Sequence, residues 1–368
     1  MNIVSFDIPF PPNYGGVIDV FYKIKAFHQL GQKVTLHCFQ YNQRKPDKTL
    51  LQYCDKVHYY PRDKSIRSLS LKTPFIVKSR KHNQLLQNLQ QDNNPILFEG
   101  LHSCYYLSHP LLKERFKMVR AHNVEAEYYS ILANNETNLL KRGYYFTESF
   151  LLRQYEKNLM HSDLIMAISP NDHQYFSKKF KKTYYLPVFH NQESITIQEG
   201  KGTYALYHGN LSVNENITAA MFLLEKIIPS TSIAWMMAGK NPPPLLQQRC
   251  KEKNVQLIPN SSHEQMQQLL QNAHVNVLPT FQPTGIKLKL LNALHSGRYC
   301  IANDFMVQNT GLAPLCLIAN NPEAFIQHLH NIQDQSFTQP MIETRKRLLK
   351  EKFDNIENAR KLLEFVGA

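Results

Sequence analysis

The residues best suited to chemistry in this sequence lie at positions 279–304, in the stretch PTFQPTGIKLKLLNALHSGRYCIAND. Gly285 is followed by Lys287, Lys289 and Asn292, and a helical pattern begins at these residues. A helix N-terminus presents unpaired N–H groups and a partial positive charge, which favour a bound anion. Glycine lets a phosphate approach the backbone closely. The stretch therefore predicts a site for a phosphate or diphosphate group.

The two lysines stand at the helix end where the macrodipole disfavours positive charge, and a bound diphosphate would remove that conflict. Their side chains diverge if both are helical, and they converge only if Lys287 still belongs to the preceding loop. Asn292 falls on the same helix face as Lys289, so a lysine and an amide could address one ligand together. Taken alone, two lysines near a helix start more often form a solvated face. The rest of the chain has to decide between these interpretations.

Two apolar runs flank this helix. HVNVLP at 274–279 predicts a buried strand, and YCIA at 299–302 predicts a second strand, which closes a strand–helix–strand unit. In an open α/β sheet, ligands bind beyond the carboxyl ends of the strands. The loop that holds Thr284 and Gly285 occupies that position.

Composition narrows the possible functions. The chain has 368 residues, which suits two domains of ordinary size, and a formal net charge of +13 that attracts nucleotide phosphates, acidic lipids or nucleic acid. It lacks a basic segment followed by a long apolar one at its start, and no run approaches the roughly 18 apolar residues of a membrane span. We therefore expect a soluble cytoplasmic protein. The six cysteines form no CxxC pair, and no metal site is predicted.

Apolar runs alternate with helical patterns along the chain, which is typical of a parallel, doubly wound α/β sheet. Strands are predicted in the first half at 2–6, 33–39, 56–60, 95–99, 117–121, 163–168 and 184–186. A second series follows at 204–208, 233–238, 255–258, 274–278, 299–302 and 316–318. We predict an N-terminal domain over residues 1–186, a linker over 187–203, a second domain over 204–340, and a C-terminal helix over 341–368 that packs across both domains.

Three features of the first half could serve function. Gly15 and Gly16 lie in a loop after the first strand and permit close approach to a ligand, although they do not form GxGxxG. His122 ends a predicted strand, where such folds place chemistry, but with sixteen histidines a structural role is the commoner one. Residues 61–82 carry seven basic residues against Asp63 alone. This segment fits either an anionic membrane surface or a solvated basic face.

A further long helix is predicted over residues 139–160. Its apolar positions include Tyr144, Phe150 and Leu151, which we expect to form a buried stripe, since core packing is far commoner for such residues than a base-stacking platform. The sequence contains no nucleic-acid-binding module, so we expect no nucleic acid partner.

The sequence resembles glycosyltransferases of the GT-B fold. It shares with them two halves of alternating strands and helices, a Gly-Gly loop after the first strand, and a helix start suited to a phosphate late in the second half. More narrowly it resembles the retaining family 4 and the related group 1 transferases. The segments that carry the resemblance are PFPPNYGGVIDVFYKIKAF, TPFIVKSR, LFEGLH, AHNVEAEYY, LYHGNLSVNEN and TGIKLKLLNALHSGR. The last is the most specific, because bacterial members often carry GTGxKxKxLEALxxG there. The resemblance covers essentially the whole chain and implies two Rossmann-like, doubly wound parallel-sheet domains facing a cleft.

The resemblance also implies roles for single residues. His122 matches a histidine that relatives place near the transferred sugar, and Lys289 would stabilise the charge that develops on the leaving diphosphate. The implied donor-binding residues are Gly15, Gly16, Asn210, Gly239, Thr284, Gly285, Lys287, Lys289 and Asn292. The co-substrate would be a UDP- or GDP-linked sugar, with no cofactor and no metal, since a DxD-like acidic pair is missing. The acceptor would be a glycan or a lipid-linked saccharide.

Two positions depart from the family pattern. Family 4 enzymes typically carry a Glu, seven residues and a second Glu, where this chain has Thr284 and Asn292. An amide can hydrogen-bond a ribose hydroxyl, but it lacks the charge of a carboxylate. The resemblance implies a retaining hexosyltransferase of surface or exopolysaccharide synthesis. Its expected place is the cytoplasm, with peripheral contact to an anionic membrane as one of the two interpretations of residues 61–82. The alternative is a catalytically weakened relative that binds nucleotide sugar or a partner subunit without turnover.

Overall fold

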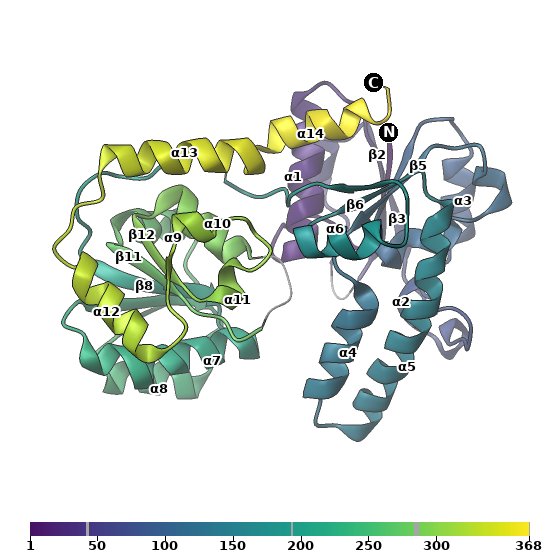
Figure 1. The fold of residues 1–368 in the computed structure, drawn as a ribbon. Helices are drawn as coiled ribbons and strands as arrows, with labels where there is room; N and C mark the ends of the chain where they lie inside the picture. The colour runs from purple at the N-terminus through teal and green to yellow at the C-terminus, as the bar shows by residue number, and fades with distance from the viewer. Residues whose placement is uncertain (42–43, 193, 283–286, 368) are drawn as a thin grey trace. The chain divides into compact units, whose positions relative to one another are not determined.

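The computed structural model describes residues 1–41, 44–192, 194–282 and 287–367 (Figure 1). The chain divides into two compact units, which are described here one at a time. Unit 1 is Met1–Asn191 with Phe353–Ala368, and unit 2 is Gln192–Lys352. In the described part of the chain, no helix combines the length and the apolar character that crossing a membrane requires.

Unit 1 is built on a parallel sheet with the strand order β3-β2-β1-β4-β5-β6-β7. Its strands are β1 (Asn2–Ser5), β2 (Thr35–Gln40), β3 (Lys56–Pro61), β4 (Ile96–Glu99), β5 (Lys117–Ala121), β6 (Leu164–Ala167) and β7 (Thr183–Tyr185). Its α-helices are α1 (Gly15–Gln29), α2 (Phe75–Lys78), α3 (Asn83–Leu89), α4 (Glu125–Asn135), α5 (Leu139–Tyr155), α6 (Pro170–Ser177) and α14 (Asn355–Glu364). Short 3₁₀ helices occupy Lys48–Gln52, Ile66–Ser68, Leu101–Tyr106, Pro110–Leu112 and Glu156–His161.

The core of unit 1 lies on both faces of this sheet. Alternate strand residues point to opposite faces, so Ile3 and Val4 of β1 belong to two different apolar clusters. One cluster includes Phe27 of α1 and Leu362 of α14, and the other includes Leu152 of α5. Because both faces are covered, the strands are nearly continuous apolar runs, which is why the sequence predicts them well.

Unit 2 repeats the architecture with the strand order β10-β9-β8-β11-β12-β13, all parallel. Its strands are β8 (Tyr204–Asn210), β9 (Ala234–Lys240), β10 (Gln256–Pro259), β11 (Val275–Leu278), β12 (Tyr299–Ala302) and β13 (Leu317–Ile318). Its α-helices are α7 (Asn214–Phe222), α8 (Pro244–Glu252), α9 (His263–Asn272), α10 (Leu288–Ser296), α11 (Asp304–Val307), α12 (Pro322–Ile332) and α13 (Gln339–Phe353). A π-helix at Leu223–Ile227 extends α7, and 3₁₀ helices occupy Ile228–Ser230 and Ala313–Leu315.

Both sheets reverse their strand order next to the first strand of the unit. The reversal lies between β1 and β4 in unit 1 and between β8 and β11 in unit 2. At such a switch point the loops after neighbouring strands run in opposite directions and leave a crevice at the carboxyl edge, where ligands of open α/β sheets bind. The functional residues should therefore be sought after β1, β4 and β5 in unit 1, and after β8 and β11 in unit 2.

The predicted fold class, two doubly wound parallel sheets, is confirmed. Two expectations about helices are wrong. The C-terminal stretch forms two helices rather than one, because the Asp354 carboxylate accepts hydrogen bonds from the first backbone N–H groups of α14 and caps a new start there. The expected stripe on α5 is only partly buried: Leu151 is 5% exposed, whereas Tyr144 is 38% and Phe150 is 61% exposed.

Candidate functional site

The two predicted phosphate-site lysines of unit 2 lie at the switch point, just after β11. Lys287 is the residue before α10 and has non-helical backbone angles, φ −89° and ψ 51°. It therefore belongs to the loop, which is the condition under which the two lysine side chains converge. Thr284 and Gly285, which the sequence also assigns to this site, lie outside the described residues.

Lys289 sits in a buried polar environment. Its Nζ donates to Asn216 Oδ1 at 2.8 Å and lies 5.5 Å from the centroid of the Tyr207 ring. Burial and, to a smaller extent, the positive charge of Lys287 lower the pKa of Lys289 to about 8, against the opposing effect of the Glu215 carboxylate. The Lys289 ammonium group therefore loses its proton at a pH only slightly above neutral.

Lys287 is also largely withdrawn from solvent. Its Nζ donates to the Gln282 carbonyl oxygen at 2.9 Å and lies 3.8 Å from Glu215 Oε1. Burial lowers the pKa of Lys287 as well, and Glu215 opposes the shift. Glu215 is the one described carboxylate whose charge acts on both lysines, and it also accepts a hydrogen bond from the Thr280 hydroxyl. One buried and one half-buried cation therefore share a single anion among the described residues, and the site carries a net positive charge.

Asn210 belongs to the same cluster. It ends β8, and its backbone oxygen accepts a hydrogen bond from Asn216 Nδ2 at 2.9 Å, so that Asn216 bridges Asn210 and Lys289. Gly239 lies on β9, where a Cβ would come 1.9 Å from the Gly209 oxygen. Close packing against the Gly209 backbone therefore explains the glycine at position 239 without any ligand.

Asn292 lies further along α10 than the lysines. Its Oδ1 accepts a hydrogen bond from Gln192 Nε2 at 3.1 Å, and its side chain is half-buried. The structure therefore joins Lys289 to Asn210 through Asn216, places Lys287 beside Glu215, and gives Asn292 a different described partner.

Sequence reasoning missed three residues of this cluster, Glu215, Asn216 and Thr280. A signal for Glu215 was present, because an acidic residue in the first turn of a helix that follows a strand marks a helix start near the carboxyl edge. The role of Asn216 as a bridge depends on a contact with Lys289 across 73 residues, which no local pattern shows.

In unit 1, His122 stands at the carboxyl end of β5 and is 5% exposed. Its Nε2 lies 3.0 Å from Glu99 Oε2 at the end of β4. An ionised carboxylate only accepts hydrogen bonds, so Nε2 carries the proton and donates it. His122 Nδ1 is buried and has no hydrogen-bond partner among the described residues. It is left as an acceptor for a hydroxyl group.

Glu99 is part of a closed ionic network. Lys23 Nζ donates to Glu99 Oε1 at 2.6 Å and to Asp19 Oδ2 at 3.0 Å, and Arg120 donates to both oxygens of Asp19 at 2.9 and 3.1 Å. All four side chains are fully buried. Although burial raises the pKa of both carboxyls, Lys23 lowers the pKa of Glu99, and Arg120 with Lys23 lowers that of Asp19, so both lie below their ordinary values.

This network also bears on metal binding. Ligand atoms of Asp19, Glu99 and His122 lie within 4.8 Å of one another, a spacing that a metal ion could bridge. Lys23 and Arg120 already donate to the two carboxylates, so two cationic side chains supply the charge that a metal would bring. The donor set therefore fits an internal ion-pair network better than a metal centre.

The Gly-Gly pair predicted to face a ligand begins α1 at Gly15. A Cβ on Gly16 would lie 2.6 Å from the Phe6 Cζ, so Gly16 makes room for that ring. Phe6 in turn packs edge-on against His122, with ring centroids 5.4 Å apart. Gly16 thus influences the position of His122 through Phe6.

Glu125 and His102 complete the carboxyl edge of unit 1. Glu125 Oε1 is buried without a hydrogen-bond partner in the described part of the chain and lies 3.7 Å from His102 Nδ1. Burial raises the pKa of Glu125 to about 8 and, with the Arg80 charge, moves the pKa of His102 well below its usual value. Both groups are therefore neutral at pH 7.

Comparison with known proteins adds to this geometry. Residues 202–335 match the family described as glycosyl transferases group 1. The chain is 26% identical over 353 residues, 89% of each chain, to an uncharacterized 44.6 kDa protein of the cps region of Klebsiella pneumoniae. Anabaena HepE, solved with UDP-glucose, has a TM-score of 0.67 at 10% identity and covers 100% of this chain and 99% of its own.

A glycosyltransferase from Rickettsia africae has a TM-score of 0.66 at 14% identity, with 99% of this chain and 97% of its own covered. At such identities the two solved structures establish the fold, and the family match shows a sequence similarity that covers residues 202–335 of unit 2. Together they confirm the resemblance to group 1 glycosyltransferases of the GT-B fold.

Proposed function

We propose that this protein is a retaining glycosyltransferase that moves a hexose-type sugar from a UDP- or GDP-linked donor to a glycan or lipid-linked saccharide. The observation that carries the proposal is the pair of lysines at the start of α10, of which Lys287 is buried and Lys289 half-buried, and which share one carboxylate at a sheet switch point. Retention of anomeric configuration is proposed from the resemblance to family 4. The UDP-sugar bound to HepE and the cps-region relative support the donor and the polysaccharide product.

The proposed catalysis is electrostatic. As the sugar–phosphate bond breaks, negative charge grows on the leaving diphosphate, and preorganised cations and helix N–H groups stabilise it most at that moment. Lys287 and Lys289 would supply the cations, and the start of α10 the N–H groups. No metal or cofactor is needed in this scheme. Asn210, Gly239, Thr284, Gly285 and Asn292 remain proposed donor contacts.

His122 would act on the sugar. Its Nε2–H is held by Glu99, which fixes the ring, and its Nδ1, buried without a partner among the described residues, would accept a hydrogen bond from a sugar hydroxyl once the atom becomes accessible. Gly15 and Gly16 would allow the donor or acceptor to approach α1. His122 is then a positioning group for the sugar, and the developing charge is left to the lysines of unit 2.

The first test is a thermal-shift screen with UDP, GDP, ADP, CMP and their sugar conjugates, with and without EDTA. A ligand that binds only the folded state raises stability by about 2.7 kcal/mol at a hundredfold excess over its dissociation constant. We expect a shift with UDP or GDP that EDTA does not change, and transfer or slow hydrolysis of the matching donor. Tight nucleotide binding without turnover would favour the weakened, non-catalytic relative instead.

We also propose peripheral contact of unit 1 with an anionic membrane at the cytoplasmic face. Residues 64–72 expose Ile66, Leu69 and Leu71 by 83%, 56% and 91%, and Lys64 and Lys72 beside them are exposed. Such binding requires two contributions. Apolar side chains enter the lipid–water interface, and lysines contact the anionic headgroups.

The start of α5 has the same character. Leu139 and Leu140 are 79% and 87% exposed and are followed by exposed Lys141 and Arg142. Helices α4 and α5 lie side by side as a hairpin that extends away from the sheet of unit 1 (Figure 1). A membrane contact would use this hairpin end together with residues 64–72.

Vesicle cosedimentation tests this contact. The protein should sediment with vesicles that contain anionic lipid and much less with neutral ones, and a variant with Ile66→Ser and Leu71→Ser should lose most of this binding. Leu111→Ser is the matched control, because Leu111 is 60% exposed elsewhere in unit 1. Equal sedimentation of both variants would refute a role for residues 64–72.

A further inference from the structure

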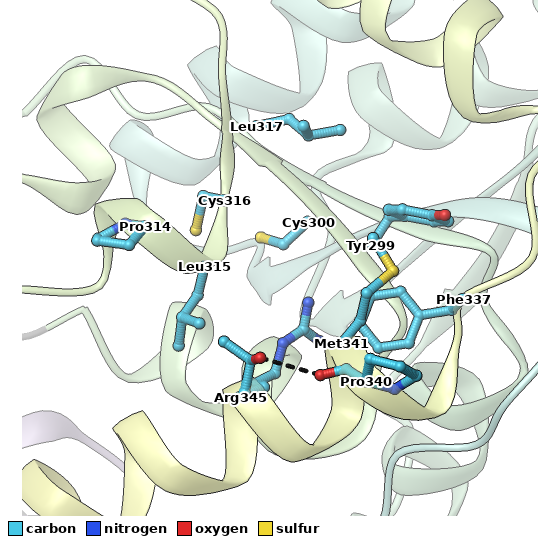
Figure 2. A pocket seen from close by; sticks show the side chains of 11 residues that line it. Tyr299, Cys300, Pro314, Leu315, Cys316, Leu317, Phe337, Pro340, Met341 and Arg345 are labelled. Carbon is cyan, nitrogen blue, oxygen red and sulfur yellow. Dashed lines mark hydrogen bonds between the residues drawn. The ribbon is translucent and has the colours of Figure 1, made fainter.

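A pocket of about 330 Å³ lies in unit 2 beside the edge strand β13 (Figure 2). Tyr299 and Cys300 at the start of β12, Cys316 just before β13, and the first turns of α13 form its walls. The strands are parallel, so this is the amino-terminal end of β12 and β13. The lysine cluster lies at the opposite, carboxyl end of the sheet, and the pocket is therefore separate from the proposed donor site.

Arg345 of α13 is the central polar group of the pocket and is only 4% exposed. Its Nη1 donates to the Gly297 and Arg298 carbonyl oxygens at 2.7 and 2.6 Å. Its Nε and Nη2 have no hydrogen-bond partner among the described residues, and neither atom is sealed inside the protein. Figure 2 shows the side chain rising from α13 between the Tyr299 and Phe337 rings on one side and Leu315 on the other.

The Arg345 guanidinium lies over the Phe337 ring, with Cζ 4.6 Å from the ring centroid, but no anionic side chain among the described lining residues balances its charge. Of the described residues that line it, Arg345 alone carries a formal charge. The contact with the Cys316 thiol, together with burial, raises the pKa of Cys300 well above its usual value, so that thiol is uncharged at pH 7. A buried cation with unused donors is costly unless an anion or water meets it. The pocket is thus suited to an anion.

The donor geometry selects the kind of anion. Nε–H and Nη2–H of a guanidinium lie on one edge and point in parallel, which matches the two oxygens of a carboxylate. A phosphate would call for further cations, and the described lining offers none. The remaining wall is apolar: the Tyr299 and Phe337 rings meet edge to face with centroids 5.1 Å apart, and Leu315 and Met341 line the pocket with them.

We propose that this pocket binds a small monocarboxylate with an apolar body, of the arylalkanoate type. The carboxylate pairs with Nε and Nη2 of Arg345, and the apolar body lies against the lining side chains of Leu315 and Met341. The volume is at the small end of the range for ligand pockets, roughly 300–1,000 Å³, which suits a compact ligand. The proposal is independent of the proposed transferase activity.

The probe is 3-phenylpropionate, with its uncharged amide as the comparison ligand, and binding is measured by calorimetry and by ligand-observed NMR on the full chain. We expect the acid to bind about 10- to 100-fold more tightly than the amide, which cannot accept two charge-assisted hydrogen bonds. Equal binding of acid and amide, or no binding of the acid at all, would overturn the proposal.

Arg345 also holds two backbone carbonyls, so its replacement risks the local fold. The deciding variant is therefore Leu315→Trp, which fills the pocket and leaves Arg345 in place. Leu245→Trp is the matched control, since Leu245 is 58% exposed on α8 and does not line the pocket. We expect Leu315→Trp to weaken binding of the acid at least tenfold, and Leu245→Trp to bind as the natural protein does. Unchanged binding by Leu315→Trp would place the acid elsewhere.

Discussion

The two units carry ionic clusters at equivalent places in equivalent sheets, but the clusters balance their charges differently. In unit 1, the carboxylates of Asp19 and Glu99 meet Lys23 and Arg120, and each charge has an opposite partner within hydrogen-bond distance. In unit 2, two lysines share Glu215. A balanced buried network fixes the shape of a site, because any change leaves a charge unpaired. A cluster with an excess of positive charge, such as the one in unit 2, can still gain favourable electrostatic energy when an anionic ligand binds.

Breaking the balanced network should have the largest effect. Asp19→Asn leaves Arg120 and Lys23 buried against Glu99 alone, and we expect a loss of about 3–5 kcal/mol in the free energy of unfolding, measured by urea denaturation. Asp334→Asn is the control, since Asp334 pairs with Lys201 at the surface and is 95% exposed. If both variants lost equally little stability, the network would not hold unit 1 together.

The buried carboxyl of Glu125 in unit 1 should make the stability of the protein depend on pH. The pKa of Glu125 is raised by burial from 4.5 to about 8, so the folded state binds a proton more tightly than the unfolded state. Its stabilising contribution is complete below pH 4.5 and is lost as pH rises through 8. Glu125→Gln stays neutral, so its stability relative to the natural protein should rise by about 2–4 kcal/mol between pH 5 and pH 8.

Denaturation at several pH values measures this difference. Glu127→Gln is the matched control, because Glu127 lies in the same first turn of α4 and is exposed. A Glu125→Gln curve parallel to that of the natural protein would show that the carboxyl is ionised in the folded state.

Removing a charge from the lysine cluster of unit 2 should weaken ligand binding and leave the stability of the fold nearly unchanged. Lys289→Met should weaken nucleoside-diphosphate binding by about 1.5–3 kcal/mol in calorimetry, the usual range for a hydrogen bond to a charged group. The unliganded fold should keep its stability, because burial already disfavours the charged lysine. Lys253→Met at an exposed position serves as the control. Unchanged affinity would remove Lys289 from the phosphate site.

The same lysine predicts the pH dependence of binding. Its pKa of about 8 in the unliganded protein means that the cation is lost as pH rises above 8. Affinity for the diphosphate should therefore fall between pH 8 and pH 9 in the natural protein and should change much less in Lys289→Met.

The smallest effect is expected at Asn292. Asn292→Glu restores the carboxylate that family 4 members carry, and it should tighten donor binding by about 0.5–1.5 kcal/mol if the residue contacts the ribose. Asn292→Gln is the control for side-chain length. Weaker binding of the Glu variant would show that Asn292 serves a different ligand.

The strands were predictable to within two or three residues, because strands covered on both faces are apolar runs between polar loops. The place of Lys287 and Lys289 near a helix start was also predictable from the local sequence, and their role in binding a phosphate stays a prediction. The boundary at Lys287 was not, since helix starts shift by a residue or two without a visible signal. The ionic network of unit 1 joins Asp19 to Arg120 across 101 residues, and such pairs leave no local pattern.

Helix α10 has a positive partial charge at its start and a negative one at its end, and a different cationic group lies near each end. Its start carries Lys287 and Lys289, so a diphosphate there would meet both the lysines and the positive pole. At its other end, Arg345 donates to the carbonyl of Gly297, the residue that ends the helix, and so meets the negative pole. Nine residues rise about 13 Å. The cation of the proposed carboxylate pocket and the cations of the proposed donor site therefore lie at opposite ends of one helix, so their separation is set by its length.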